Sequence, residues 1–250
     1  FGGYPHYSWI RQQARFRRFV PPPLASPLHA AAQTLLPVGL RGRNFILGLT
    51  APRPLRLVQA NSYFDERARR ALMAPLHFSR NGHQSPEAYK MALSADSVDI
   101  VDQVTRLDFR TYLVDDILVK VDRASMLTSL EVRAPFLDYR IIDFAYGRVP
   151  ARLKATASER KMLLRLLAKR VLPPEFDSVR KQGFSIPLHE WFAGEWGDYM
   201  TGVLLEADGF FDKKMVAELI AGQRRGRSNT QRIFALTLFE LWRREYGITA

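Results

Sequence analysis

"VDDILVKVDRASMLTSLEVRAPFLD", residues 114–138, joins two patterns that decide the fold. Its first half repeats apolar side chains at helical spacing, as at Ile117 and Val121, which predicts a helix. Its second half alternates charged and apolar residues, so that Glu131 and Arg133 face the same side of an extended segment. The stretch therefore predicts a helix that is followed by an extended return segment.

The same stretch carries an unusual number of charged side chains among apolar ones. Charged groups resist leaving water unless they find partners. One interpretation is a buried polar network that fixes a turn, and the other is a wall of an active site; composition alone favours the first. Asp116 precedes Lys120 by four residues, the favourable order for an ion pair on a helix. The candidate network consists of Asp116, Lys120, Asp122, Arg123, Glu131, Arg133 and Asp138.

Helical patterns dominate the rest of the chain, and side chains that cap helices mark their starts. The expected helices, with the capping residue first, are Ser85 for 86–93, Asp138 for 139–147, Ser158 for 159–172, Asp212 for 213–226 and Asn229 for 230–247. The short apolar runs 44–49 and 55–60 fit either helix or strand. We therefore expect one mainly α unit, with a soft boundary near residue 60.

Charge is distributed unevenly along the 250 residues, whose net charge is +12. Residues 1–60 hold eight arginines and no acidic residue, which indicates either an anionic partner or a solvated basic face. The chain has no cysteine, so disulfides and cysteine nucleophiles are excluded, as a reducing compartment would favour. Its five histidines are scattered without ligand spacing, and no apolar run is long enough to span a membrane.

Two basic positions could meet a phosphate. Arg180 and Lys181 precede Gly183 in a predicted tight loop, where cations can approach an anion closely. Lys161 falls in the first turn of a predicted helix, where the helix dipole disfavours a cation unless an anion is bound. Taken alone, each position is better explained as an ordinary solvated basic residue.

Three motifs in order resemble the C-terminal part of the glutamine-dependent asparagine synthetase family. They are "FGGY" at 1–4, the stretch 115–138, and "RKQGFSIPLHEWF" at 180–192. The resemblance implies the helical half of an α/β, adenine-nucleotide α-hydrolase-like (PP-loop ATPase) synthetase domain, with residues 1–250 as its C-terminal portion. In this family a pyrophosphate loop and a glutamine amidohydrolase domain lie upstream, so we expect the chain to be a piece of a longer protein.

The resemblance also implies a reaction. A carboxylate, usually the side chain of aspartate, attacks ATP to give an acyl-adenylate and pyrophosphate, and glutamine-derived ammonia then displaces AMP to give asparagine. Lys181 matches the catalytic lysine, and Lys161, Lys181 and Arg180 would bind ATP and pyrophosphate. Mg²⁺ would be held mainly by upstream acidic residues, so we expect the 250 residues alone to bind ATP weakly and to be inactive.

Several alternatives stay open from the sequence. The basic N-terminal block would also suit a helical module that binds nucleic acid, although the three motifs make that partner unlikely. A family member could instead amidate another carboxylate, such as a polysaccharide precursor. The resemblance implies a cytoplasmic enzyme of asparagine biosynthesis, and apolar surface exposed on a partial domain leaves a homodimer open.

Overall fold

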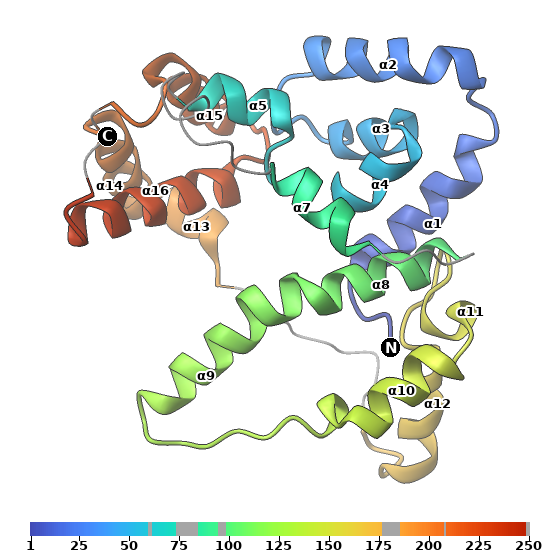
Figure 1. Cartoon of the computed structure of the whole chain (residues 1–250). Helices are drawn as coiled ribbons and strands as arrows, with labels where there is room; N and C mark the ends of the chain where they lie inside the picture. The colour runs from blue at the N-terminus through green and yellow to red at the C-terminus, as the bar shows by residue number, and fades with distance from the viewer. Residues whose placement is uncertain (60–61, 74–84, 95–98, 177–185, 208, 249–250) are drawn as a thin grey trace. The chain divides into compact units, whose positions relative to one another are not determined.

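The computed structural model describes residues 1–59, 62–73, 85–94, 99–176, 186–207 and 209–248. These residues are mainly helical, so the predicted fold class is confirmed (Figure 1). Their extended pairing is confined to two isolated bridges, Met73–Phe211 and Ala155–Arg160. Both ambiguous apolar runs belong to helices as far as they are described.

The described chain divides into two compact units whose segments interleave, so the division does not follow the charge step near residue 60. Unit 1 comprises Phe1–Pro21, Ala51–Ala60 and Ser85–Lys181, and unit 2 comprises Pro22–Thr50, Asn61–Gln84 and Gln182–Ala250. The elements of unit 1 are α1 (Pro5–Arg17), α4 (Arg53–Gln59), α7 (Pro86–Leu93), α8 (Ile100–Arg110), η1 (Leu113–Leu118), α9 (Val119–Met126), η2 (Pro135–Leu137), α10 (Tyr139–Gly147), α11 (Ala151–Lys154) and α12 (Met162–Val171). Those of unit 2 are α2 (Pro22–Leu35), α3 (Arg43–Thr50), α5 (Glu66–Leu72), α13 (Leu188–Phe192), α14 (Glu195–Leu205), α15 (Lys213–Arg224) and α16 (Thr230–Glu245).

The core of unit 1 forms where α1 crosses α8. Val101 and Val104 of α8 pack against Tyr7 and Ile10 of α1, and all four side chains are buried. Asp99 caps α8 by accepting the backbone N–H of Val101 at 2.8 Å. The cap fixes where α8 begins, and so which of its faces meets α1.

The core of unit 2 lies between α14, α15 and α16. Leu204, Val216 and Ile233 are fully buried there and come from one helix each. Asp212 caps α15 as predicted, accepting the backbone N–H of Met215 at 2.7 Å. Apolar burial of this kind is the main stabilising contribution to a helical unit, at about 25 cal/mol per Å².

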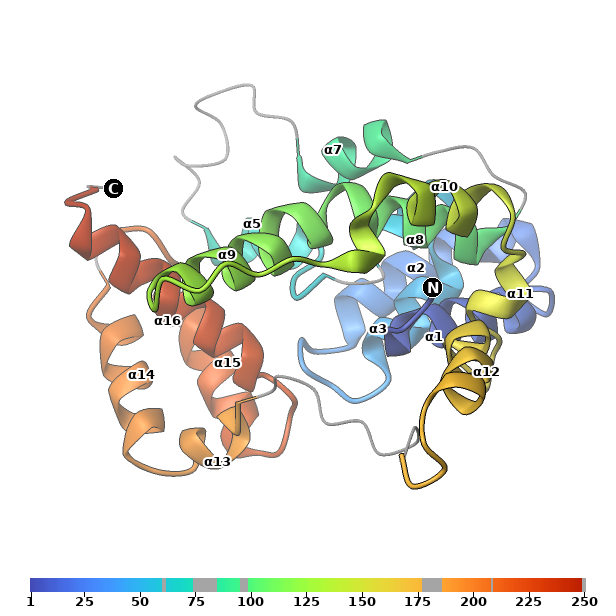
Figure 2. The same cartoon turned by 90° about the horizontal axis from the view of Figure 1, so that it is seen from below.

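The central stretch folds as predicted, as a helix and an extended return. Figures 1 and 2 show α8, η1 and α9 as one continuous rod, after which the chain runs back through residues 127–134 to η2. Ser129 makes the reversal with a left-handed backbone, at φ +56°. This return segment, residues 127–134, runs back along the rod toward the start of α10 (Figure 1).

One predicted helix start is wrong. Ser158 lies in a turn rather than at a helix N-terminus, and α12 begins at Met162. The cause is a small hairpin, in which the Ala155–Arg160 bridge uses the residues that the sequence pattern assigns to the first helical turn. Lys161 therefore precedes α12 instead of lying inside it.

Candidate active site

The rod changes its helical form where two acidic residues lie. Thr111 leaves helical geometry at φ −126° and ψ −84°, and its hydroxyl donates to the Leu107 carbonyl at 2.8 Å. The six residues of η1 then follow π-helical bonding, a rare form that is frequent at functional sites. Asp115 and Asp116 lie in this turn and are exposed. The backbone alone thus singles out the predicted stretch.

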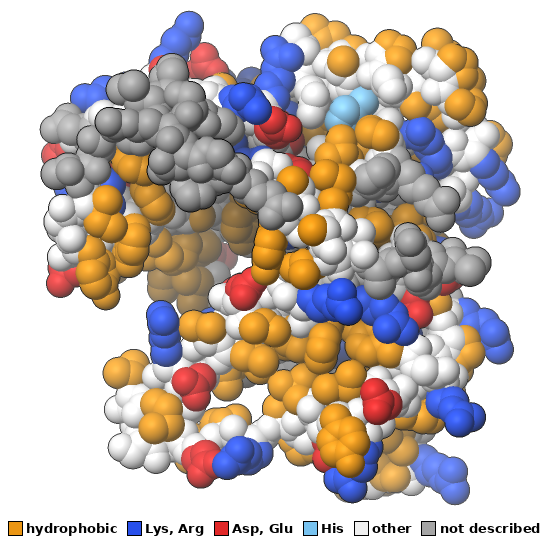
Figure 3. Space-filling model, viewed as in Figure 1, with side chains coloured by type: hydrophobic (Ala, Val, Ile, Leu, Met, Phe, Trp, Pro, Cys, Tyr) orange, Lys and Arg blue, Asp and Glu red, His pale blue; other side chains and the backbone are white. Residues whose placement is uncertain are grey.

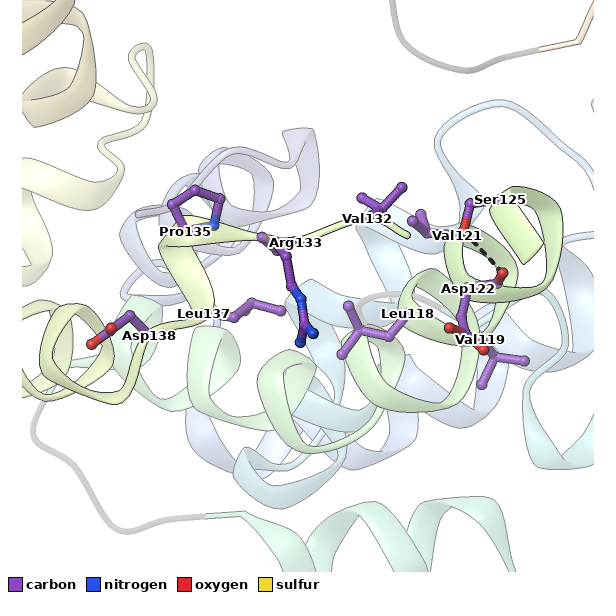
Figure 4. A pocket seen from close by; sticks show the side chains of 11 residues that line it. Leu118, Val119, Val121, Asp122, Ser125, Val132, Arg133, Pro135, Leu137 and Asp138 are labelled. Atoms are coloured by element: carbon purple, nitrogen blue, oxygen red, sulfur yellow. Dashed lines mark hydrogen bonds between the residues drawn. The ribbon is translucent and has the colours of Figure 1, made fainter. Parts of the chain in front are cut away.

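A pocket of about 780 Å³ opens between α9 and the return segment (Figure 4). Three residues of the predicted network line it: Asp122 from α9, Arg133 from the return segment and Asp138 before α10. Most of the remaining wall is aliphatic, and comprises Leu118, Val119, Val121, Val132, Ala134, Pro135 and Leu137, with Ser125. A few polar groups on an apolar wall are typical of pockets that orient a small ligand.

Glu131 and Arg133 bond to each other and not to the helix. They form an ion pair whose side chains are 69% and 86% exposed, so the predicted buried network is wrong for this pair. Alternate residues of an extended segment share one face, and two long side chains can meet there while both stay hydrated. An exposed pair contributes at most about 1 kcal/mol. The pair therefore places charge at the pocket more than it stabilises the fold.

Asp138 caps α10, as predicted. Its carboxylate accepts the backbone N–H of Arg140 at 2.9 Å and pairs with the Arg140 guanidinium at 2.7 Å. The guanidinium hydrogen bond, followed by the backbone bond, lowers the pKa of Asp138 below its usual range. Asp138 thus presents a fixed negative charge at the rim of the pocket.

The four network residues on the rod do not connect to one another. Asp116, Lys120, Asp122 and Arg123 are all exposed, and the predicted ion pair between Asp116 and Lys120 is not formed. The supporting role of these residues stays a prediction.

Lys161 meets the first motif of the chain. It precedes α12 with a left-handed backbone, at φ +56°, and its N–H donates to the Lys154 carbonyl at 2.9 Å. A Cβ added to Gly3 would lie 2.6 Å from Cε and 3.6 Å from Nζ of Lys161. The lysine stem thus lies directly on the "GG" backbone, which joins two motifs that stand far apart in the sequence.

The other two predicted phosphate ligands cannot be placed. Arg180 and Lys181 lie outside the described residues, as does Gly183 of their predicted loop. The catalytic role of Lys181 and the phosphate-binding role of both residues stay predictions.

A buried ion pair that was not predicted from the sequence supports the Lys161 region. Lys154 is 1% exposed, and its Nζ lies 2.5 Å from Asp102 of α8 and 4.7 Å from the ring centre of Tyr146. Arg106 stands one turn from Asp102, at 3.8 Å. Burial raises the pKa of Tyr146 to about 12. The i,i+4 spacing of Asp102 and Arg106 was a usable signal, whereas nothing in the sequence points to Lys154.

A second polar cluster holds α1 to α8. The Asp108 carboxylate contacts His6 Nε2 at 2.7 Å and accepts the Tyr7 hydroxyl at 2.8 Å. Burial, and then the Asp108 charge, raise the pKa of Tyr7. Asp108, Tyr7 and Lys154 line a smaller pocket of about 200 Å³ beside Gly2. The "FGGY" motif therefore lies over a polar, aromatic floor.

Part of the basic N-terminal block is engaged in structural contacts. Arg11 pairs with Asp99 at 2.8 Å within unit 1, and Arg43 pairs with Asp65 at 2.6 Å within unit 2. The Arg43–Asp65 pair is almost fully buried. These two arginines hold their own units together, which weakens the case for one continuous nucleic-acid surface.

The described ranges of the chain lack two further kinds of site. Those residues contain no group of three or more His, Asp or Glu side chains arranged to hold a metal ion, so they offer no Mg²⁺ cage of their own. No described helix combines the length and the apolar run that crossing a bilayer needs.

The helices and the order of the motifs define the helical half of a PP-loop synthetase domain. The chain belongs to the asparagine synthase family, whose sequence model matches residues 1–244. It is 26% identical over 245 residues to "Asparagine synthetase [glutamine-hydrolyzing] 1" of Bacillus subtilis. It is 31% identical over 250 residues to "Putative asparagine synthetase [glutamine-hydrolyzing]" of Mycobacterium tuberculosis. Each alignment covers 97% of this chain, but only 38% and 37% of the relatives' length. No solved structure matches the chain.

Proposed function

We propose that the chain contributes the helical half of the synthetase site in an ATP-dependent amidoligase. The complete protein would convert the side-chain carboxylate of aspartate into an acyl-adenylate and transfer glutamine-derived ammonia to it, giving asparagine, AMP and pyrophosphate. The family match and the names of the relatives support this reaction class. The 250 residues contain no S-G-G-x-D-S loop, so we expect them to bind ATP weakly by themselves.

The observation that carries the proposal is the pocket formed by the central stretch. Asp122, Arg133 and Asp138 stand 16 positions apart at most in sequence and line one cavity of about 780 Å³. Its volume falls in the range of small-molecule sites. An exposed guanidinium at such a wall can bind a carboxylate with two parallel hydrogen bonds, and the exposed Asp122 carboxylate can orient an ammonium group. Both groups occur in aspartate.

Cations fixed in advance would carry the catalytic effect. Negative charge accumulates on the leaving pyrophosphate, and a preorganised ammonium stabilises it without reorganising. Lys161, held on the Gly3 backbone, is one such group, and Lys181 is the predicted second. Two unit charges 4 Å apart interact with about 4 kcal/mol at an effective dielectric constant of 20. Mg²⁺ would neutralise further phosphate charge when bound by upstream residues.

The proposal can be tested on the first half-reaction. The full-length protein containing this chain should exchange labelled pyrophosphate into ATP only when aspartate is present, with no nitrogen donor needed. Lys181→Ala should reduce the exchange by about 100-fold or more, as expected when one charge-stabilising donor is removed. Pyrophosphate exchange that does not depend on aspartate, or that is unchanged by Lys181→Ala, would contradict the proposed function.

Arg133 gives a second test, because its pair is exposed. Arg133→Ala should change the free energy of unfolding by less than about 1 kcal/mol. Turnover should nevertheless fall, with a raised KM for aspartate. Arg170→Ala, which removes an exposed arginine of α12, is the matched control and should change neither quantity. Normal turnover by the Arg133→Ala variant would contradict the proposal that this pocket binds the substrate.

The nucleic-acid alternative makes opposite predictions. Nucleic-acid binding should weaken steeply with salt and tolerate Lys181→Ala. Amidation of a different carboxylate would instead show as pyrophosphate exchange with that acid and not with aspartate. The cytoplasmic setting and the homodimer remain predictions.

A further inference from the structure

The two glycines of "FGGY" are required because Lys154 and Lys161 pack directly against their backbone. Gly2 has φ +72°, and a Cβ there would stand 2.5 Å from the Lys154 carbonyl oxygen. A Cβ on Gly3 would stand 2.6 Å from Cε of Lys161. Both distances are shorter than real side chains allow, so the turn between Lys154 and Lys161 rests directly on this backbone. Backbone collides at Gly2, whereas only the flexible end of a side chain collides at Gly3.

The turn itself is fixed on several sides. Its ends are joined by the bond from the Lys161 N–H to the Lys154 carbonyl, and inside it the Thr156 N–H donates to the Glu159 carbonyl at 2.8 Å. Gln12 of α1 donates to the carbonyl at position 157, also at 2.8 Å. The chain therefore reaches residue 161 in one conformation, and that conformation includes the left-handed backbone of Lys161.

The buried ion pair anchors this turn to the core. Lys154 ends α11, and its ammonium reaches Asp102 on α8 while the same residue's carbonyl holds Lys161. A left-handed backbone at a residue other than glycine costs about 1–2 kcal/mol and persists where surrounding contacts enforce it. The Lys154–Asp102 pair and the Gly2–Gly3 backbone are those contacts.

We propose that the Lys154–Asp102 pair and Gly3 are positioning elements for Lys161. They hold its ammonium at one place on the "FGGY" backbone, so that it can meet the leaving pyrophosphate without rearrangement. This inference rests on the proposed function, and it assigns roles to Asp102, Lys154 and Gly3 that act only through Lys161.

Gly3→Ala tests the idea with little risk to folding. The three atoms nearest to the new methyl group all belong to the movable end of Lys161, so helix content should be kept while the ammonium is displaced. Pyrophosphate release by the full-length protein should fall by about 10- to 100-fold, as for a misplaced catalytic group. The loss should appear in kcat, with KM for aspartate unchanged. Gly147→Ala is the matched control, because a Cβ there meets nothing within 4 Å.

A double-mutant cycle separates positioning from general structural damage. In a Lys161→Ala background, Gly3→Ala should reduce pyrophosphate release by less than about twofold, because the ammonium group that it displaces is already absent. Lys154→Met, measured on folded protein, should likewise reduce pyrophosphate release by less than about twofold in the Lys161→Ala background. Equal losses in both backgrounds would overturn the proposal. Wild-type protein that releases no pyrophosphate would instead refute the proposed function, so the two failures are distinguishable.

Discussion

Removing the Lys154 ammonium should destabilise unit 1 and leave unit 2 untouched. Lys154→Met keeps the length of the stem but leaves the Asp102 carboxylate, 18% exposed, without its closest cation. Losing one partner of a buried pair costs about 3–5 kcal/mol. Arg106, 3.8 Å from Asp102, compensates part of this and favours the lower end of the range. The lost contact with the Tyr146 ring adds about 1 kcal/mol.

We therefore expect a loss of about 4 kcal/mol, which corresponds to roughly 1,000-fold lower protection from hydrogen exchange. Exchange measured by mass spectrometry on peptides from α8 and α11 should show the loss, while peptides from α15 and α16 serve as the internal reference. Lys169→Met, at an exposed lysine of α12, is the matched control and should change protection by less than about twofold. Wild-type protection of α8 in Lys154→Met would refute the reasoning.

Two further predictions concern unit 2. Arg43→Met should cost about 3–5 kcal/mol in urea unfolding, because Asp65 then stays buried without its cation; a change below 1 kcal/mol would contradict the buried pair. Burial opposes ionisation of Glu240, but hydrogen bonds from Arg243 and Arg244 outweigh it and lower its pKa below the usual 4.5. The carboxylate therefore contributes stability above pH 4.5 that is lost as the pH falls through the lowered pKa. Glu240→Gln should flatten this acid limb of melting temperature against pH, and an unchanged limb would contradict the assignment.

The helical class and many helix ends could be read from the sequence, because caps are local. Ser85, Asp138 and Asp212 each accept a backbone N–H at the helix start that the pattern predicts. The predicted helix start at Ser158 was wrong because a hairpin bond, which depends on a residue several positions away, competes with the helix for the same backbone groups. Asn229 marks its helix start correctly, but its amide donates to the Leu219 carbonyl instead of capping the helix.

The candidate site was predictable in composition and not in arrangement. The charged residues of the central stretch can be identified in the sequence, and three of them line one pocket in the structure. Their burial could not be predicted, since Glu131 and Arg133 satisfy each other while remaining hydrated. The π-helical turn and the Lys154–Asp102 pair arise from tertiary packing, which leaves no periodic pattern in the sequence. Figure 3 shows apolar side chains on the face over α9 and α10, and the exposed apolar side chains of α10 include Phe144, at 49%.

The most direct test of the central claim follows one oxygen atom. When the full-length protein is given ATP, glutamine and aspartate labelled with ¹⁸O in its side-chain carboxylate, an acyl-adenylate mechanism forms a carboxylate–phosphorus bond and breaks the carbon–oxygen bond when ammonia attacks. Mass spectrometry should therefore find one ¹⁸O in each AMP released, with asparagine as the other product. Unlabelled AMP, or ADP and phosphate as products, would contradict the account.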